Sequence, residues 1–479
     1  MRRFTRFISA VAASIIVLMS AGAGFISADN TMTAEQQVEA ISVGWNLGNT
    51  FDSYGTWINN VTPYSVETAW GNPETTREML AAVRQRGFNA IRIPVTWAQF
   101  LDDEGHVDDA WMARVRQVVD WSLEEGLYVI LNVHHDTGEH GDDKVCWLIA
   151  DTGNYESNEG RFATLWTEIA DEFKDYDNRL MFEGYNEFLD MNNTWNSPST
   201  GTGAYDAVNS YAQLFVDTVR ATGGNNSTRN LIVNTYVASV DQVVLDSFVL
   251  PNDSAEDHLI CEVHAYVPWN FCSHDGDASY TTFDDNCRNE IDNVMNRLSA
   301  FSESRGVPVI IGEFACESQN NDSDRASYAA YFTSRAAEEG IRVFWWDNGS
   351  FDYGNYAILD RSSLTWTDEI ASALVDNAPD GTAPAVTETS ETTETTAAET
   401  SVAASEVTGT TASAAVTEVA ETAVNTDETA ISGADNSQSV NGNHKSLSIL
   451  LIVGGVVVAA SYVGLFMLGR KMGRNKRGR

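Results

Sequence analysis

Eight short apolar runs, separated by longer amphipathic stretches, constrain the fold of this chain more than any other feature. Each run has the length and near-continuous hydrophobicity of a strand buried on both faces, which is typical of parallel sheets. The runs are Val43–Leu47, Ala90–Pro94, Tyr128–Val133, Leu180–Tyr185, Leu231–Asn234, Leu259–His264, Pro308–Gly312 and Arg342–Trp346. The predicted helices between them are Thr75–Arg86, Asp108–Glu125, Phe162–Lys174, Ala204–Thr222, Ile291–Ser304 and Arg325–Glu339.

The number of strand and helix units predicts an α/β fold in the form of a closed (β/α)8 TIM barrel over residues 29–378. Glycines at 87, 126 and 340 each stand shortly before a predicted strand, where a helix C-terminus is expected. An open doubly wound sheet is the alternative fold. No Gly-x-Gly-x-x-Gly motif follows the first run, which disfavours that alternative.

Polar groups stand at or just after the ends of seven of these runs, whose bodies are apolar. They are Asn46, Arg92, His134, His135, Asn186, Glu187, His264, Tyr266, Glu313 and Trp346, which closes the eighth run. Any one of them has a structural explanation, because a single strand-end histidine is more often hydrogen-bonded structure than catalyst. Packing does not explain the whole set, since a buried polar group costs about 1 to 3 kcal/mol unless it is satisfied. Barrel enzymes keep their active sites at this end of the strands.

Two of these residues, Glu187 and Glu313, are carboxylates on separate strand ends. In a barrel such groups can face each other across a cleft. A carboxylic acid facing a carboxylate nucleophile is what cleavage of a glycosidic bond needs. The pair therefore predicts glycoside hydrolysis.

Eight segments at the strand ends resemble glycoside hydrolase family 5, a family of retaining barrel enzymes. They are Gly44-Trp-Asn-Leu-Gly-Asn-Thr50, Trp70-Gly-Asn-Pro73, Ile91-Arg-Ile-Pro-Val-Thr-Trp97, Leu131-Asn-Val-His-His135, Phe182-Glu-Gly-Tyr-Asn-Glu187, Val263-His-Ala-Tyr266, Ile311-Gly-Glu-Phe314 and Phe344-Trp-Trp-Asp-Asn-Gly349. The family usually has proline after its acid/base glutamate, whereas this chain has Phe188. The resemblance covers nearly the whole expected barrel.

The resemblance implies a role for each strand-end residue. Glu313 would be the nucleophile, and Glu187 would be the general acid and later the general base, with a pKa raised by the nearby charge of Glu313. Asn186 would hydrogen-bond the 2-hydroxyl of the reacting sugar. The other implied residues bind substrate or support the two carboxylates: Arg92, His134, His135, His264, Tyr266 and, as a sugar platform, Trp346.

Thirteen tryptophans are present, and some of them must belong to the core. Trp345 is expected there, because its neighbour Trp346 points the other way on a strand. Four tryptophans fall in expected loops at the catalytic end, where each could either stack on a sugar or pack within its loop. They are Trp57, Trp147, Trp195 and Trp269. Together they suggest a long open cleft and internal cleavage.

We expect no metal and no cofactor at this site. His134 and His135 are adjacent, which does not suit chelation from one strand, and hydrolysis by two carboxylates needs no ion. The expected activity is that of a retaining endo-β-1,4-glucanase acting on cellulose-like chains, mixed-linkage β-glucan or xyloglucan. A β-mannanase is the alternative within the class. A non-catalytic polysaccharide-binding surface protein is the alternative outside it.

Both ends of the chain carry membrane signals. Residues 1–28 read as a secretory signal peptide. Residues 379–445 are rich in Thr, Glu, Ala and Ser and predict a disordered linker. Residues 446–469 predict a transmembrane helix, and the basic residues of 470–479 a cytoplasmic tail. We therefore expect a monomer on the extracellular face of the cell membrane, anchored by this helix.

The part between the two membrane signals carries 19 basic and 68 acidic residues, a net charge of −49. Such a surface disfavours nucleic acid as a partner and leaves a neutral β-glucan acceptable. Five cysteines cannot all pair within one chain. Cys272 and Cys287, in one expected loop, are the only pair that the spacing offers.

Overall fold

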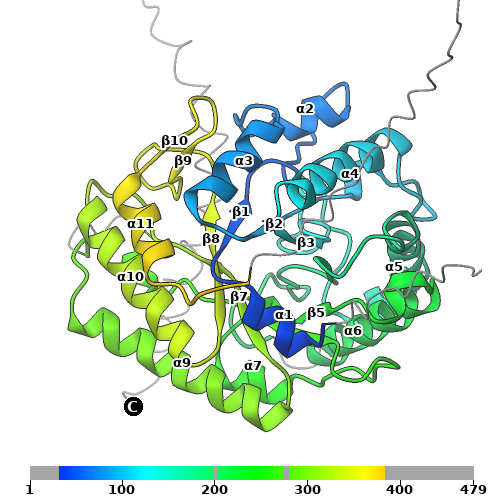
Figure 1. Cartoon of the computed structure of the whole chain (residues 1–479). Coiled ribbons are helices and arrows are strands. Elements are labelled where there is room, and N and C mark those ends of the chain that lie inside the picture. Colours follow the sequence, from blue (N-terminus) through cyan, green and yellow to red (C-terminus); the bar gives the residue numbers. More distant parts are fainter. Residues whose placement is uncertain (1–31, 199–202, 274–279, 383–479) are drawn as a thin grey trace, which may run out of the picture. The chain divides into compact units, whose positions relative to one another are not determined.

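The computed structural model describes residues 32–198, 203–273 and 280–382, and these form a closed barrel of parallel strands surrounded by helices (Figure 1). The strands pair in chain order, and β8 pairs with β1 to close the barrel. Their bounds are β1 (Gly44–Leu47), β2 (Ala90–Ile93), β3 (Tyr128–Asn132), β4 (Leu180–Glu183), β5 (Leu231–Asn234), β6 (Leu259–His264), β7 (Val309–Phe314) and β8 (Arg342–Asp347). The expected TIM barrel is confirmed, and the open sheet is excluded.

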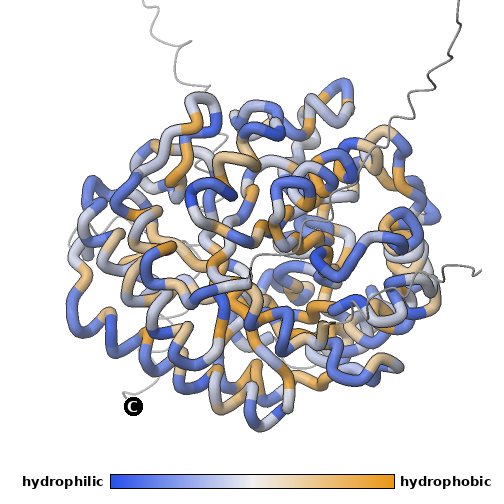
Figure 2. Tube along the Cα trace, in the orientation of Figure 1, coloured by the Kyte–Doolittle hydropathy of each residue, from blue (hydrophilic) through white to orange (hydrophobic). Residues whose placement is uncertain are grey.

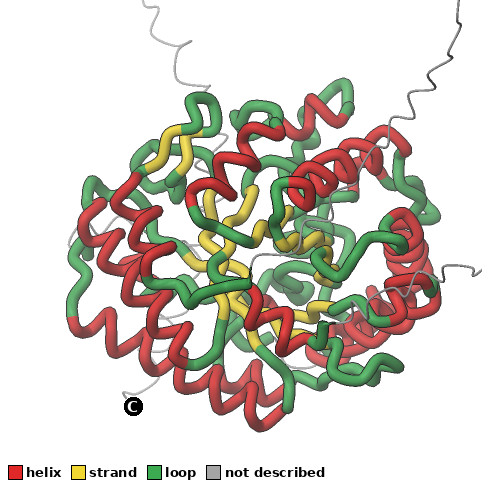
Figure 3. Tube along the Cα trace, viewed as in Figure 1, coloured by secondary structure: helices red, strands yellow, loops and turns green. Residues whose placement is uncertain are grey.

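Helices connect successive strands and form the outer layer, while α1 precedes β1 and α11 follows the last strand (Figure 3). They are α1 (Ala34–Ala40), α2 (Pro63–Glu67), α3 (Arg77–Arg86), α4 (Asp109–Glu124), α5 (Thr152–Glu172), α6 (Ala204–Ala221), α7 (Gln242–Ser247), α8 (Trp269–Cys272), α9 (Asp285–Arg305), α10 (Asp322–Glu338) and α11 (Asp368–Asp376). A small antiparallel pair, β9 (Leu359–Asp360) and β10 (Thr365–Trp366), follows β8.

The strands bury residues on both faces, and two apolar clusters result. On β3, for example, Val129 and Leu131 belong to the large cluster under the helices, whereas Tyr128 and Ile130 belong to a smaller one inside the barrel. Residues of α1 join the inner cluster, so that this helix closes the N-terminal end of the barrel. Hydrophilic residues follow the outer turns of the helices, as Figure 2 shows. This two-sided burial explains why the strands read as apolar runs.

The two ends of the described barrel meet beside this closed end. The backbone N–H of Thr382 donates to the carbonyl of Ala40, 3.1 Å away. Ala40 ends α1 just before β1 begins, so residue 382 lies at the face opposite the strand C-termini.

Capping residues explain where two helices begin earlier than the sequence suggested. The side chain of Asp151 accepts from two backbone amides and starts α5 ten residues before Phe162. Asp284 does the same for α9, ahead of Ile291. The first turns of both helices are polar, and apolar periodicity does not detect such turns. No helix was predicted at α1, α2, α7, α8 or α11, because each has nine residues or fewer and so gives only a short apolar repeat.

The pairing of Cys272 with Cys287 was wrong, because all five cysteines, which lie in the described residues, are free thiols. Cys272 ends α8, and its Sγ lies 3.3 Å from the Tyr328 hydroxyl. Cys287 lies in the first turn of α9 with its Sγ 3.9 Å from the carbonyl of Thr282. The two sulfur atoms are therefore not bonded to each other.

The expected signal peptide 1–28, the membrane helix 446–469 and the tail 470–479 lie outside the described residues, as does the linker from residue 383 onward. Among the residues that are described, no helix combines the length and the apolar composition that crossing a bilayer requires.

Candidate active site

Inside the barrel, the inward-facing side chains change from apolar to polar toward the C-terminal ends of the strands. On β2 Ala90 is followed two residues later by Arg92, and on β4 Met181 is followed by Glu183. The inward polar residues of the strands are Asn46, Arg92, Asn132, Glu183, Asn234, Glu262 and His264, and all of them are buried. A polar layer therefore lies on top of an apolar one, where barrel enzymes hold their catalytic groups.

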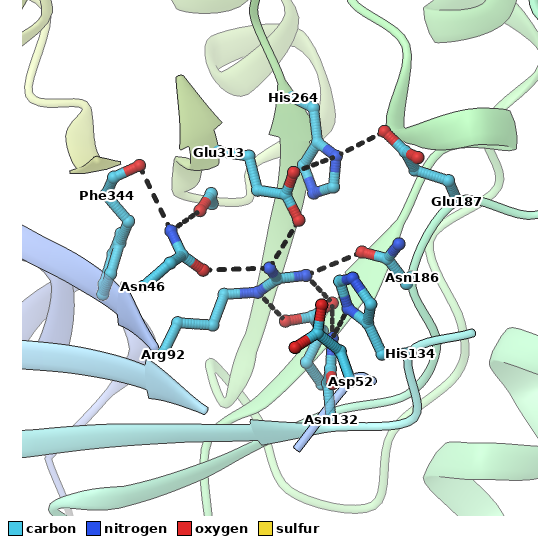
Figure 4. A network of polar contacts seen from close by, with 12 residues as sticks. Asn46, Asp52, Arg92, Asn132, His134, Asn186, Glu187, His264, Glu313 and Phe344 are labelled. Carbon is cyan, nitrogen blue, oxygen red and sulfur yellow. Dashed lines mark hydrogen bonds and ion pairs between the residues drawn. The ribbon is translucent and has the colours of Figure 1, made fainter. Parts of the chain in front are cut away.

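Arg92 is the centre of this polar layer (Figure 4). Its Nε and Nη2 donate to the two oxygens of Glu183, at 2.6 and 2.8 Å. Its Nη2 also donates to Asn186 Oδ1 at 2.8 Å, and its Nη1 donates to Asn46 Oδ1 at 3.1 Å and to Glu313 Oε1 at 2.7 Å. A guanidinium with so many acceptors is fixed in orientation.

Glu313 is held on both of its oxygens. Arg92 Nη1 donates to Oε1, and the Tyr266 hydroxyl donates to Oε2 at 2.9 Å. Burial, followed by the charge of Glu313, raises the pKa of Tyr266 well above its usual range, so Tyr266 stays a neutral donor. Glu313 lies inside β7 rather than just after it, one residue before the strand ends.

Glu187 follows β4 in a loop, and its side chain is 21% exposed. Its Oε1 lies 2.9 Å from Nδ1 of His264, and the same nitrogen lies 3.6 Å from Glu313 Oε2. One oxygen of each glutamate and one nitrogen of His264 all lie within 4.8 Å of one another. Retaining glycosidases keep their two carboxyl groups roughly 5 to 5.5 Å apart, and this spacing is compatible with that value.

The pKa of Glu187 is raised, mainly by burial and to a smaller extent by the charge of Glu313, while His264 opposes the shift. The expectation that the charge of Glu313 is the main cause was wrong. Partial removal of this carboxyl group from water disfavours its charged form even without a charged neighbour.

Burial opposes a charge on His264, but Glu313, Glu187 and Glu262 outweigh it and raise the pKa of His264 to about 10. The two histidines that follow β3 behave in the opposite way. Burial, together with positive neighbours, lowers the pKa of His134 well below its usual range and that of His135 to about 3.

His134 and Trp346 form one wall of the site. Their rings are nearly parallel, with an angle of 5° and centroids 5.8 Å apart. Asn132 donates through Nδ2 to His134 Nδ1 at 3.1 Å, and its Oδ1 accepts from the amide of Val95. His134 Nδ1 is therefore an acceptor, and its Nε2 carries the proton.

His135 lies apart from the two glutamates. Its Nε2 lies 3.7 Å from Asp52 Oδ2, and its ring contacts Tyr54 and Trp70 at centroid distances of 5.3 and 5.6 Å. It therefore belongs to an aromatic group beside the site rather than to the carboxylate pair.

The four loop tryptophans differ in environment. Trp57 is 62% exposed and Trp269 is 38% exposed, so part of each side chain faces solvent. Trp147 donates to Asp136 at 2.6 Å and lies under the Arg161 guanidinium at 4.4 Å, as a packed residue does. Trp195 is half-buried with its Nε1 3.4 Å from Glu139. Trp345 is fully buried, as predicted.

Glu183, Glu262, Asn132 and Asn234 belong to the site but were not proposed from the sequence. Each stands inside an apolar run and two residues from an inward-facing apolar residue. The available signal was a polar residue two positions from an apolar residue of the inner core, because alternate residues of a strand point to the same side.

Two clusters in the described residues bring three possible metal ligands within 4.8 Å: Asp52 with His134 and His135, and Glu187 with His264 and Glu313. Arg92 opposes a cation at both, because its charge acts on the two histidines and it is paired with Glu313. The absence of a catalytic metal stays a prediction.

Residues 51–352 match the family described as cellulase (glycosyl hydrolase family 5). Endoglucanase A of Clostridium longisporum is 36% identical over 360 residues, which are 73% of this chain and 67% of that protein. A family 5 enzyme of Prevotella bryantii, solved with a xyloglucan tetradecasaccharide, is 40% identical with a TM-score of 0.65. A broad-specificity endoglucanase of Ruminococcus champanellensis with bound cellotriose is 38% identical with a TM-score of 0.66. Each structure aligns with 72% of this chain over 99% of its own length.

Proposed function

This chain belongs to glycosyl hydrolase family 5 and is a glycoside hydrolase, and from that premise we propose that it is a retaining endo-β-1,4-glucanase. Its proposed substrates are cellulose-like chains, mixed-linkage β-glucan and xyloglucan. The observation that carries the proposal is the arrangement of Glu187 and Glu313 around His264, with an oxygen of each within 4.8 Å of the other. This spacing leaves no room for a water molecule behind the sugar and suits direct attack by a carboxylate.

In the first step, Glu313 attacks the anomeric carbon while Glu187 gives its proton to the glycosidic oxygen. The bond between that carbon and the leaving chain breaks, and a covalent glycosyl-enzyme forms. Arg92 and Tyr266 hold the Glu313 carboxyl group in a fixed orientation, with contacts of 2.7 and 2.9 Å. The raised pKa of Glu187 keeps its proton available.

In the second step, Glu187 takes a proton from water, and the resulting hydroxide attacks the anomeric carbon and releases Glu313. Loss of the Glu313 charge in the intermediate removes one of the causes that raise the pKa of Glu187, which helps it act as a base. Asn186, fixed by Arg92, is placed to bind the sugar 2-hydroxyl, an interaction that strengthens in both transition states.

The substrate assignment draws on the relatives, which are endoglucanases, and on two solved enzymes with cellotriose or a xyloglucan oligosaccharide bound. Mannan is disfavoured as a substrate, because none of these three proteins is described as a mannanase. The exposed rings of Trp57 and Trp269 support binding of several sugar units of a chain, and therefore internal cleavage.

Initial rates on carboxymethylcellulose, barley glucan, xyloglucan and mannan test this assignment. We expect hydrolysis of the first three, with a rapid fall in viscosity that marks internal cleavage, and little hydrolysis of mannan. Mannan as the best substrate would contradict the glucanase assignment. A protein that binds these polysaccharides without cleaving any of them would be a binding protein instead.

We also propose that the enzyme is a monomer exported across the membrane and held at the extracellular face by residues 446–469. The support is the uncharged Leu447–Leu468 segment and the basic residues that follow it. A variant ending before Ser446 should be released from cells in active form. Its retention in the membrane fraction would refute a single C-terminal anchor.

A further inference from the structure

Glu262 is a buried carboxylate for which the two-step reaction has no use. It lies on β6, two residues before His264, and its side chain is fully buried. Its Oε1 lies 3.3 Å from His264 Nε2 and 3.4 Å from Arg92 Nε. Its Oε2 has no hydrogen-bond partner among the described residues. A buried carboxylate with one oxygen unsatisfied is unfavourable for folding alone, so a role in the site is the better explanation.

The absence of a side chain at Gly312 leaves space for this carboxylate in the barrel. A Cβ atom at Gly312 would lie 1.8 Å from Glu262 Oε1, so no other residue fits at position 312 without moving Glu262. The β6–β7 pairing also shifts register between Val263 and His264. Gly312 directly precedes Glu313, and the backbone beside the nucleophile is therefore shaped around Glu262.

His264 bridges Glu262 and Glu187. Its Nδ1 lies 2.9 Å from Glu187 Oε1, and its Nε2 lies 3.3 Å from Glu262 Oε1. A neutral imidazole carries one N–H, which would serve only one of these carboxylates, whereas the cation carries two. The geometry therefore suits a positively charged His264 between two carboxyl groups.

We propose that Glu262 is a positioning residue that holds His264 in its cationic form and thereby sets the pH at which Glu187 loses its catalytic proton. The inference rests on the assignment of Glu187 as acid/base in the proposed function. When Glu187 ionises, its carboxylate faces an N–H of His264. A cationic His264 stabilises that carboxylate more than a neutral one does, and so lowers the pH at which the proton is lost.

The other charged groups around the bridge come from several strands. They are Arg92 on β2, Glu183 on β4, Glu187 after β4, and Glu313 on β7. Burial, followed by the charge of Glu183, raises the pKa of Glu262 to about 7, while Arg92 and His264 act in the opposite direction.

Glu262→Gln tests the proposal, because glutamine keeps the size and an acceptor oxygen but removes the charge. We expect the alkaline limb of kcat/KM to move to higher pH by about one unit, which is about a tenfold gain at a pH on that limb. Histidine ¹⁵N NMR should show His264 losing its proton at lower pH than in the unmodified protein, where its pKa is about 10.

Glu67→Gln is the matched control. Glu67 is also fully buried and paired with an arginine, Arg114 at 2.9 Å, but lies on α2 away from the site. The Glu67→Gln substitution should lower the melting temperature and leave both the pH profile of kcat/KM and the His264 titration unchanged.

An unchanged His264 titration and pH limb in a folded Glu262→Gln protein would overturn the proposal. If that variant does not fold, the unmodified protein decides the matter, because an ordinary His264 titration near pH 6.5 would also overturn it. A shifted His264 titration with an unshifted alkaline limb would refute the link between Glu262 and the catalytic proton of Glu187. It would leave the acid/base assignment standing, because chemical rescue of Glu187→Ala tests that assignment separately.

Discussion

Arg92 Nη1 lies 2.7 Å from Glu313 Oε1, and the two side chains are 0% and 7% exposed. The pair joins β2 to β7 across the inside of the barrel. Because Arg92 also binds Glu183 through two hydrogen bonds, the position of the nucleophile depends on a guanidinium that is itself clamped.

Arg92→Lys should lower kcat/KM by about 100-fold or more, because one ammonium group cannot replace donors to Glu183, Asn186 and Glu313 at once. Breaking a buried ion pair also costs about 3 to 5 kcal/mol of stability. Kinetics on an aryl cellobioside and thermal unfolding measure both effects. Arg220→Lys is the control: Arg220 is a nearly buried arginine paired with Asp253 at 2.7 Å outside the site, and the variant should lose stability while kcat stays within about twofold.

Chemical rescue should separate the roles of the two glutamates. Azide should rescue Glu313→Gly with an inverted product, because the small anion attacks from the side that the nucleophile has left. It should rescue Glu187→Ala with a retained product, because the glycosyl-enzyme still forms. NMR of the product anomers decides between them. The opposite pattern would exchange the roles, and initial release of the α-anomer by the unmodified enzyme would refute retention.

The alkaline limb of kcat/KM should report Glu187, since activity is present while this acid is protonated and is lost as pH rises through its raised pKa. Glu313→Gln removes the smaller of the two raising causes and leaves burial in place. The pKa of Glu187 in that variant should therefore fall but stay above the ordinary value of about 4.3 for glutamate. Carbon-13 NMR of labelled glutamate measures it. A return to the ordinary value would show that charge, not burial, is the main cause.

The loop tryptophans should separate into binding and packing residues. Trp57→Ala should raise KM for long β-glucans by several-fold and leave the melting temperature unchanged, because its ring is 62% exposed. Trp147→Ala should instead lower stability by about 2 kcal/mol or more, since it loses a hydrogen bond to Asp136 and a cation–π contact with Arg161. Melting curves beside KM values on oligosaccharides of increasing length distinguish the two, and an unchanged KM in Trp57→Ala would remove it from the cleft.

Strand bounds could be predicted closely because a strand buried on both faces is apolar throughout, and strand ends then identify the site. Glu183 and Glu262 were not predicted as site residues. A charged residue in an apolar strand can be assigned to the site only when it is known which residues of that strand point into the barrel. The start of α5 depends on a capping contact by Asp151, which apolar periodicity does not record.

The packing and burial of single side chains were the hardest properties to predict. Trp147 and Trp57 are both loop tryptophans in the sequence, but contacts with Asp136 and with Arg161, fourteen residues away, make Trp147 a packed residue. The main cause of the raised pKa of Glu187 is likewise a property of the folded loop, since burial cannot be read from two glutamates in a sequence.

The hydrogen bond between Thr382 and Ala40 shows that the last described residue lies at the end of the barrel opposite the active site, which is useful for engineering. Both ends of the described barrel leave from the face opposite the active site, so a partner domain fused at either end starts on the side away from bound polysaccharide. The position of residue 382 beside the end of α1 also favours circular permutation. A peptide that spans the length of α1 could join residue 382 to residue 32, and new termini could be opened in an outer loop while every strand that carries a catalytic group keeps its two neighbours.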